Sequence, residues 1–102
     1  MVLRIFAVQV GPGQQAVLEP MEDEAAAHYQ AAKGCRWFAF FMDAEKGEYG
    51  GVSVWDSEAD LRRFVESGVL GPLLGRVKPL LKAPPVERLY AVYEPKAVSR
   101  TA

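Results

Sequence analysis

Two side chains are the leading candidates for chemistry, a tryptophan and the chain's single histidine. Trp55 shares the parity of its segment with Ser53 and Gly51, and small residues beside a large ring leave room for a flat ligand to stack on it. His28 falls on the apolar side of a predicted helix, and an imidazole exchanges protons near neutral pH. Each also has a structural interpretation, Trp55 as a packed core residue and His28 as a hydrogen-bonded residue at a helix edge.

Further side chains are candidate contacts for a ligand. Arg4 stands in an otherwise apolar segment, where it could pair with an anionic group of a ligand. It could equally reach solvent from the start of a strand, or bridge two subunits. Three more rings could line a cleft or pack as core or interface aromatics: Trp37, Tyr49 and Tyr90. Ser53 and Phe64 complete the predicted ligand contacts.

No pattern in the sequence indicates a metal site, a phosphate loop or a covalent nucleophile. One histidine without a nearby group of carboxylates does not define a metal site. Cys35 is the only cysteine, which excludes an intrachain disulfide, and we interpret it as a small hydrophobe. Gly11-Pro12-Gly13 is too short for a phosphate loop, and the acidic stretch from Glu22 to Glu24 is most simply a solvated helix face. We therefore expect no cofactor and no metal.

Size and charge limit the partners of the chain. It has 102 residues, of which half are hydrophobic and a quarter are charged, as is typical of one globular domain. A formal net charge of −1 provides no long-range field to attract nucleic acid or an anionic membrane. The first ten residues lack the features of a secretory signal, and no stretch approaches the roughly 18 apolar residues of a membrane span. We predict a cytoplasmic protein that binds neither nucleic acid nor membrane.

Hydrophobic periodicity predicts the elements that must position these side chains. Runs of β-branched and aromatic residues predict four strands, over residues 2–10, 35–43, 48–55 and 86–93. Apolar residues at steps of three and four predict one helix over residues 14–33 and a second helix, capped by Asp56 or Ser57 and interrupted at Gly68. Pro20 either kinks the first helix or occupies the first position of a helix that begins near Glu19. The pair Gly50-Gly51 predicts a bulge, or a close approach by something bulky.

This order is the β-α-β-β-α-β pattern of a ferredoxin-like α+β fold, in which both helices cover one face of a four-stranded antiparallel sheet. We predict one domain over residues 1–94 and a polar C-terminal tail over residues 95–102. The second strand is apolar on both sides, with Trp37, Ala39 and Phe41 on one and Phe38, Phe40 and Met42 on the other. An uncovered apolar face would exceed what soluble monomers tolerate. We therefore predict a homodimer that pairs two sheets face to face; a monomer with aromatic-rich strands is the alternative.

Four segments resemble the antibiotic biosynthesis monooxygenase family of dimeric α+β barrels: Gly11-Pro12-Gly13, Gly34-Cys35, residues 54–61 and the apolar stretch through Leu80-Leu81. The resemblance spans about residues 2–93. It depends on residues at which strands and helices begin and end, so it identifies a fold better than an activity. It implies that each subunit binds its ligand in a cleft between sheet and helices.

The resemblance also bears on activity. Family members include cofactor-independent monooxygenases of aromatic polyketides and haem-degrading enzymes, and the tryptophan at the position of Trp55 contributes to substrate oxidation in some of them. Haem degradation is disfavoured, because residues 56–82 contain no histidine, Phe64 stands where many relatives have one, and the chain has no asparagine. We expect each cleft to bind a small aromatic molecule. The resemblance alone implies cofactor-independent oxygenation, in which Trp55 would orient or oxidise the molecule and His28 would move protons. A non-catalytic dimeric module that senses a ligand or serves a structural role is the alternative.

Overall fold

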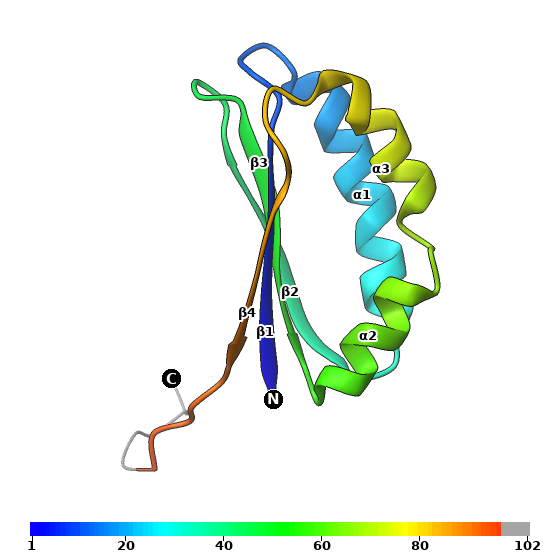
Figure 1. Ribbon diagram of the computed structural model, residues 1–102, viewed down its shortest axis with the longest axis vertical. Coiled ribbons are helices and arrows are strands. Elements are labelled where there is room, and N and C mark those ends of the chain that lie inside the picture. The colour runs from blue at the N-terminus through cyan, green and yellow to red at the C-terminus, as the bar shows by residue number, and fades with distance from the viewer. Residues whose placement is uncertain (97–102) are drawn as a thin grey trace.

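The computed structural model describes residues 1–96, which form one antiparallel sheet with helices against one of its faces (Figure 1). The elements are β1 (Val2–Gln9), α1 (Gln15–Ala31), β2 (Cys35–Asp43), β3 (Glu48–Trp55), α2 (Glu58–Glu66), α3 (Gly71–Val77), the short 3-10 helix η1 (Lys78–Leu80) and β4 (Val86–Ala91). The strands lie in the order β2-β3-β1-β4, and all neighbours are antiparallel. This is the predicted ferredoxin-like α+β arrangement. The predicted tail falls mostly outside the described residues, since they end at residue 96.

Most predicted elements form close to their predicted bounds. β2 and β3 begin and end where the sequence places them, whereas β4 ends at Ala91, two residues early. α2 begins after Ser57, whose hydroxyl accepts a hydrogen bond from the backbone N–H of Asp60 at 3.1 Å, the usual device for capping a helix. Gly68, with a φ of 74°, separates α2 from α3, because a left-handed residue cannot continue a helix.

The first helix begins earlier than the predicted alternative of a start near Glu19. It starts at Gln15, so Pro20 lies inside the helix rather than at its first position. Leu18 and Tyr29 are its buried residues. His28 is exposed, so the prediction that it lies on the apolar side of this helix is wrong, since the neighbouring Tyr29 takes the inward position.

The pairing register shows which side of each strand faces the helices. Arg4 of β1 pairs with Ser53 of β3, which pairs in turn with Phe38 of β2. Arg4 and Ser53 are both buried, whereas Trp37, one residue before Phe38, is 55% exposed. Even-numbered residues of β1 and β2 and odd-numbered residues of β3 therefore face the helices, a choice that the sequence left open.

The glycine pair of β3 does not form a bulge. Gly50 and Gly51 keep regular pairing with both neighbouring strands, and the register shift in the described sheet falls between Cys35 and Trp37. Bulky neighbours explain the pair instead: a Cβ on Gly50 would overlap the ring of Phe41 and the carbonyl oxygen of Phe6, and one on Gly51 would lie 3.3 Å from the ring of Phe40. The bulge was therefore wrong, and the close approach is confirmed.

The core between sheet and helices consists of two clusters. One joins buried residues of β1, α1, β3 and α3 with Val10, which follows β1: Val8, Val10, Leu18, Tyr49 and Val77. The other joins buried residues of α1, β3 and α2: Tyr29, Trp55, Leu61 and Phe64. No helix of the described residues is both long and apolar enough to cross a membrane.

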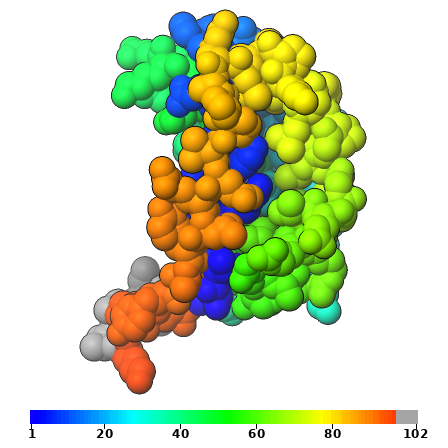
Figure 2. Space-filling model, viewed as in Figure 1, coloured from blue at the N-terminus to red at the C-terminus, as the bar shows by residue number. Residues whose placement is uncertain are grey.

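The opposite face of the sheet carries no helix (Figure 1). Large apolar side chains stand exposed on it, among them Trp37, Phe41, Val86 and Tyr90. The helices also leave β4 uncovered, because all six of its residues are exposed. In Figure 2, β4 in orange and the segment from α2 to α3 in green to yellow stand on either side of blue atoms of β1. The sheet therefore has one packed face and one open apolar face.

Candidate functional site

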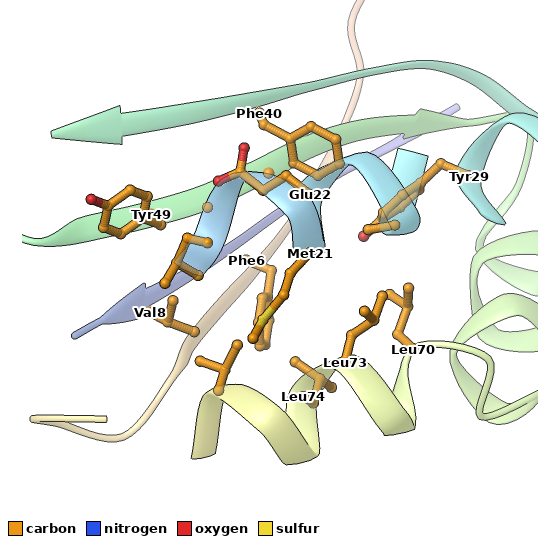
Figure 3. A pocket seen from close by; sticks show the side chains of 15 residues that line it. Phe6, Val8, Met21, Glu22, Tyr29, Phe40, Tyr49, Leu70, Leu73 and Leu74 are labelled. Carbon is orange, nitrogen blue, oxygen red and sulfur yellow. The ribbon is translucent and has the colours of Figure 1, made fainter. Parts of the chain in front are cut away.

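A mostly apolar cavity of about 100 Å³ lies between the sheet and the helices α1 and α3 (Figure 3). Its sheet side is formed by residues of three strands, namely Phe6, Val8, Phe40, Tyr49, Gly50 and Gly51. Its helix side is formed by residues of α1, the α2–α3 connection and α3: Leu18, Met21, Glu22, Ala25, Tyr29, Leu70, Leu73, Leu74 and Val77. An apolar cavity of about 150 Å³ takes up a benzene-sized molecule, so this cavity is on the scale of one ring.

Gly51 is the reason for the space on the sheet side. It faces the helices between Tyr49 and Ser53, and it contributes no side chain to the core. The ring of Phe40 comes close to the place that its Cβ would take. Neighbouring large rings and an absent side chain together leave a gap that close packing would otherwise fill.

Two polar groups of the cavity wall lack hydrogen-bond partners. The Oε1 atom of Glu22 and the hydroxyl group of Tyr49 are both buried, and neither has a partner among the described residues. In the view of Figure 3 the carboxyl group of Glu22 turns toward the side of the cavity where Tyr49 stands. Burial, reinforced by the nearby carboxylates of Glu19 and Asp23, raises the pKa of Glu22 to about 7. Glu22 therefore exchanges its proton near neutral pH.

Glu22 is the site residue that sequence reasoning missed. The acidic stretch was interpreted as a solvated face, which holds for the exposed Asp23 and Glu24 but is wrong for Glu22. The signal was available, because Glu22 stands four residues after Leu18 and three before Ala25, on the inward stripe that ends at Tyr29. Because Glu22 is charged, the search for apolar residues at helical spacing did not include it.

Of the predicted site residues, Tyr49 lines this cavity, whereas Trp55 and Ser53 lie beside it in the core. Trp55 is fully buried, and its indole N–H donates a hydrogen bond of 2.9 Å to the Ser53 hydroxyl. Its ring packs against Phe64, with centroids 5.0 Å apart. The small Ser53 thus serves as a hydrogen-bond acceptor for the tryptophan, and neither residue belongs to the cavity lining.

His28 and Phe64 meet at a different place. Both line a separate surface hollow beside α2, together with charged residues that include Asp60 and Arg63. The structure therefore does not bring His28 and Trp55 to one cavity. Among residues 1–96, no group of three or more histidine, cysteine, aspartate and glutamate side chains is arranged to hold a metal ion.

Arg4 is buried behind the cavity wall. Its Nε atom donates to Glu87 of β4 at 2.7 Å, and an NH1 hydrogen bond of 3.4 Å reaches the hydroxyl group of Tyr29. The guanidinium carbon lies 4.9 Å from the centroid of the Phe6 ring, close enough for a cation–π contact. Arg4 therefore supports two rings that line the cavity. Burial raises the pKa of Tyr29, and the positive charge of Arg4 opposes this shift.

Trp37 and Tyr90 lie far from this arrangement. Their positions on β2 and β4 place them on the open face of the sheet, where each is more than half exposed. They do not line the cavity between sheet and helices. Of the eight predicted site residues, the structure thus places one on the cavity wall, four in the core or behind the wall, and three on outer surfaces: Tyr49; Arg4, Ser53, Trp55 and Phe64; His28, Trp37 and Tyr90.

Fold and site together define a ferredoxin-like α+β domain with a mostly apolar cavity under its helices. The sequence model of the family described as antibiotic biosynthesis monooxygenase matches residues 1–70. The chain belongs to this family. No curated protein matches the sequence.

Solved structures share the fold over nearly the whole chain. Rv0793 from Mycobacterium tuberculosis is 21% identical with a TM-score of 0.78, over 94% of this chain and 98% of its own. NE2512 from Nitrosomonas europaea, a protein of unknown function, is 17% identical with a TM-score of 0.77, over 96% of this chain and 94% of its own. A variant of SnoaB from Streptomyces nogalater, a cofactor-independent oxygenase, is 15% identical with a TM-score of 0.77, over 95% and 97%. At these identities the likeness concerns the fold.

Proposed function

We propose that this protein binds a small, ring-shaped and mostly apolar molecule in the cavity between its sheet and helices, and oxygenates it without a cofactor. The observation that carries the proposal is an apolar cavity about one ring in size with a carboxyl group on its wall. Pockets that bind small molecules combine an apolar lining with a few polar groups that orient the ligand. Membership in the family and the description of SnoaB as a cofactor-independent oxygenase support the second half.

The proposed oxygenation requires only molecular oxygen as oxidant. Removal of a proton makes an aromatic ring electron-rich, and the ring then supplies electrons to O₂. In a phenol, one oxygen atom becomes a carbonyl oxygen in place of a ring hydrogen, and the other leaves as water with that hydrogen and the hydroxyl hydrogen, so the product is a quinone. Trp55 takes part as a positioning residue, because its ring lies 6.3 Å from that of Tyr29, which lines the cavity. His28 has no contact with the ligand in this proposal, since it lines a different hollow.

Binding is tested by titrating the protein with toluene and with phenol. The shifts of its backbone amide resonances in NMR spectra report which residues contact the ligand. We expect shifts at residues that line the cavity, and loss of binding in Leu74→Trp, because Leu74 is partly exposed at the cavity and an indole there fills it. Val65→Trp is the matched control, since Val65 is similarly exposed on α2 outside the cavity. Absence of binding to the wild type, or equal binding by both variants, contradicts the proposal.

Oxygen consumption separates catalysis from the second candidate, a non-catalytic module that senses a ligand. The second candidate is favoured by the position of Trp55, which is fully buried and cannot touch a ligand in the cavity. Single-ring and fused-ring phenols are offered to the wild type and to Leu74→Trp in an oxygen electrode. Consumption by the wild type alone supports an oxygenase. Binding without consumption supports the sensing module.

We also propose that the protein is a homodimer joined through the open faces of two sheets. The exposed apolar side chains of this face support it, because a single copy leaves them in water. Trp37→Glu is expected to weaken association in sedimentation experiments, whereas Val65→Glu on the helix side is expected to leave it unchanged. A wild-type protein that sediments as a monomer at high concentration contradicts this proposal.

A further inference from the structure

We propose that residues 67–74, which lead from the end of α2 into α3, form a flap that opens to admit a ligand to the cavity and then closes over it. The inference rests on the proposed function, since it describes how the ligand of that cavity enters. Val77, at the other end of α3, keeps its place in the core while the flap moves.

The first support is the size of the cavity. Its volume is about 100 Å³, whereas an apolar cavity of about 150 Å³ holds a benzene-sized molecule. Val8, Leu18 and Tyr49, which line the cavity, are nearly inaccessible to solvent. Binding of a ring against these residues therefore requires one wall of the cavity to move, because close-packed side chains leave no ready passage.

The second support is the unequal anchoring of the three walls. β1 and β3 form the centre of the sheet, and each is paired with a strand on both sides. α1 has 17 residues and contributes Leu18 to one core cluster and Tyr29 to the other. α3 has seven residues, all of them described, and Val77 alone among them belongs to a core cluster. Because a helix this short is not stable without packing, α3 is the wall that yields most easily.

The third support is the packing of the flap itself. Leu73 is buried but belongs to neither core cluster, because it borders the cavity instead. Leu70, which packs at the edge of one cluster, and the exposed Leu74 line the same space. Figure 3 shows the three leucines on the cavity side of this segment. The flap therefore lies over empty space, whereas Val77 packs in the core.

The fourth support is the position of two glycines. Gly68, with a φ of 74°, separates α2 from α3 and provides a bend within the flap. Gly75 follows the flap directly. It has no left-handed backbone, and a Cβ there would have no neighbour within 4 Å outside its own helix. Neither conformation nor space therefore requires glycine at this position. Since a glycine weakens a helix relative to alanine, Gly75 is a weak point between the flap and Val77.

Hydrogen exchange of the ligand-free, full-length protein tests the flap directly. The backbone N–H of Leu74 donates to the carbonyl oxygen of Leu70 within the flap, at 2.9 Å. The backbone N–H of Lys82, beyond Val77, donates to the carbonyl oxygen of Gln9 in β1, at 2.7 Å. The protection factor of the Leu74 amide should be lower than that of Lys82 by at least about tenfold, because opening of the flap breaks only the first bond.

The rates of toluene binding, measured from NMR line shapes, connect the flap to the cavity. Gly75→Ala should slow association and dissociation alike, about fivefold, because it stabilises the closed helix. It should change the dissociation constant little, since the ligand enters and leaves through the same opening. The protection factor of the Leu74 amide should rise about fivefold in this variant.

Two arginine variants provide a matched comparison. Arg76→Gln removes the exposed ion pair that joins α3 to Glu24 of α1, and it should speed both toluene rates about twofold to fivefold. Arg62→Gln removes an exposed ion pair within α2, with Glu58, and should leave both rates unchanged.

Equal protection of the Leu74 and Lys82 amides in the wild type overturns the flap and leaves the proposed cavity binding intact. The same conclusion follows if toluene binds with unchanged rates in both Gly75→Ala and Arg76→Gln, or if Arg62→Gln changes the rates as much as Arg76→Gln does. Failure of toluene to bind the wild type overturns the proposed function and this inference together.

Discussion

The adjacent glycines of β3 should respond in opposite ways to the same substitution. Gly50 and Gly51 pair regularly within the sheet, and their positions alternate between its two faces. Gly51→Ala places a methyl group on the helix side, next to the cavity. Gly50→Ala places it on the open face, against the carbonyl oxygen of Phe6 and the ring of Phe41. We expect the first variant to be at least as stable as the wild type and the second to be less stable.

The magnitude follows from the space around each methyl group. At Gly51 the new Cβ lies 3.3 Å from the Phe40 ring and 3.6 Å from the carbonyl oxygen of Ala39, so a slight shift of a ring beside a cavity relieves the contact. Replacing glycine in a strand stabilises by about 0.5–1 kcal/mol through the unfolded state. At Gly50 the obstacle includes backbone of the neighbouring strand, and overpacking costs about 1–3 kcal/mol. The two variants should therefore differ by about 2 kcal/mol.

Urea denaturation followed by far-ultraviolet circular dichroism measures this difference. With a slope of about 1–3 kcal/mol per M of urea, a difference of about 2 kcal/mol separates the two midpoints by about 1 M. Several protein concentrations should be compared, because self-association adds to apparent stability. Equal midpoints, or a Gly50→Ala protein that is the more stable of the two, would refute the assignment of faces on which the cavity depends. Gly51→Ala should also weaken toluene binding, since it takes up cavity volume.

Three further substitutions test individual contacts. Because the pKa of Glu22 is raised from 4.5 to about 7, the native state keeps a proton that the unfolded chain releases, and stability falls as pH rises through this window. Glu22→Gln should flatten this slope in urea titrations and stabilise the protein by about 1–2 kcal/mol at pH 8, after allowance for solvent screening; an unchanged slope contradicts this. Glu87→Gln removes the ionic partner of the buried Arg4 and should cost about 1–2 kcal/mol in thermal unfolding, whereas no loss would show that the pair contributes little. Ser57→Ala removes the cap of α2 and should cost about 1 kcal/mol, while Ser57→Asp should retain most of the stability.

Glycines at the ends of the structural elements explain why much of the fold was predictable. β2 and β3 are bounded by Gly34 and Gly47 with left-handed backbones, a conformation for which glycine is the ordinary choice. Such residues mark the ends of elements in the sequence itself. β4 was predicted two residues too long, because Val92 and Tyr93 continue the apolar pattern beyond the last residue that pairs with β1. Pairing depends on the length of the neighbouring strand, which a local pattern does not contain.

The site was less predictable because it depends on which face each strand turns inward. Both parities of β2 are apolar, so the pattern could not distinguish the cavity side from the open side. Trp55 was predicted beside a pocket because Ser53 is small, but the serine hydroxyl accepts the hydrogen bond of the indole. Glu22 was missed because acidic side chains are usually solvated. The error at Glu22 concerns packing between a helix and the sheet, whereas the error at Trp55 concerns a hydrogen bond between two side chains of one strand.

The glycine pair also explains how one strand can serve two different faces. Large rings cross β3 on both sides, Phe41 over Gly50 on the open face and Phe40 beside Gly51 under the helices. On the open face the ring of Phe41 lies against the Gly50 backbone and fills the space above it. Under the helices the ring stands beside the glycine, and the space that remains becomes the cavity. A side chain at Gly50 would displace the Phe41 ring, and a side chain at Gly51 would take up cavity volume. Two adjacent glycines therefore shape the two faces of β3, one beneath the Phe41 ring and the other beside the cavity.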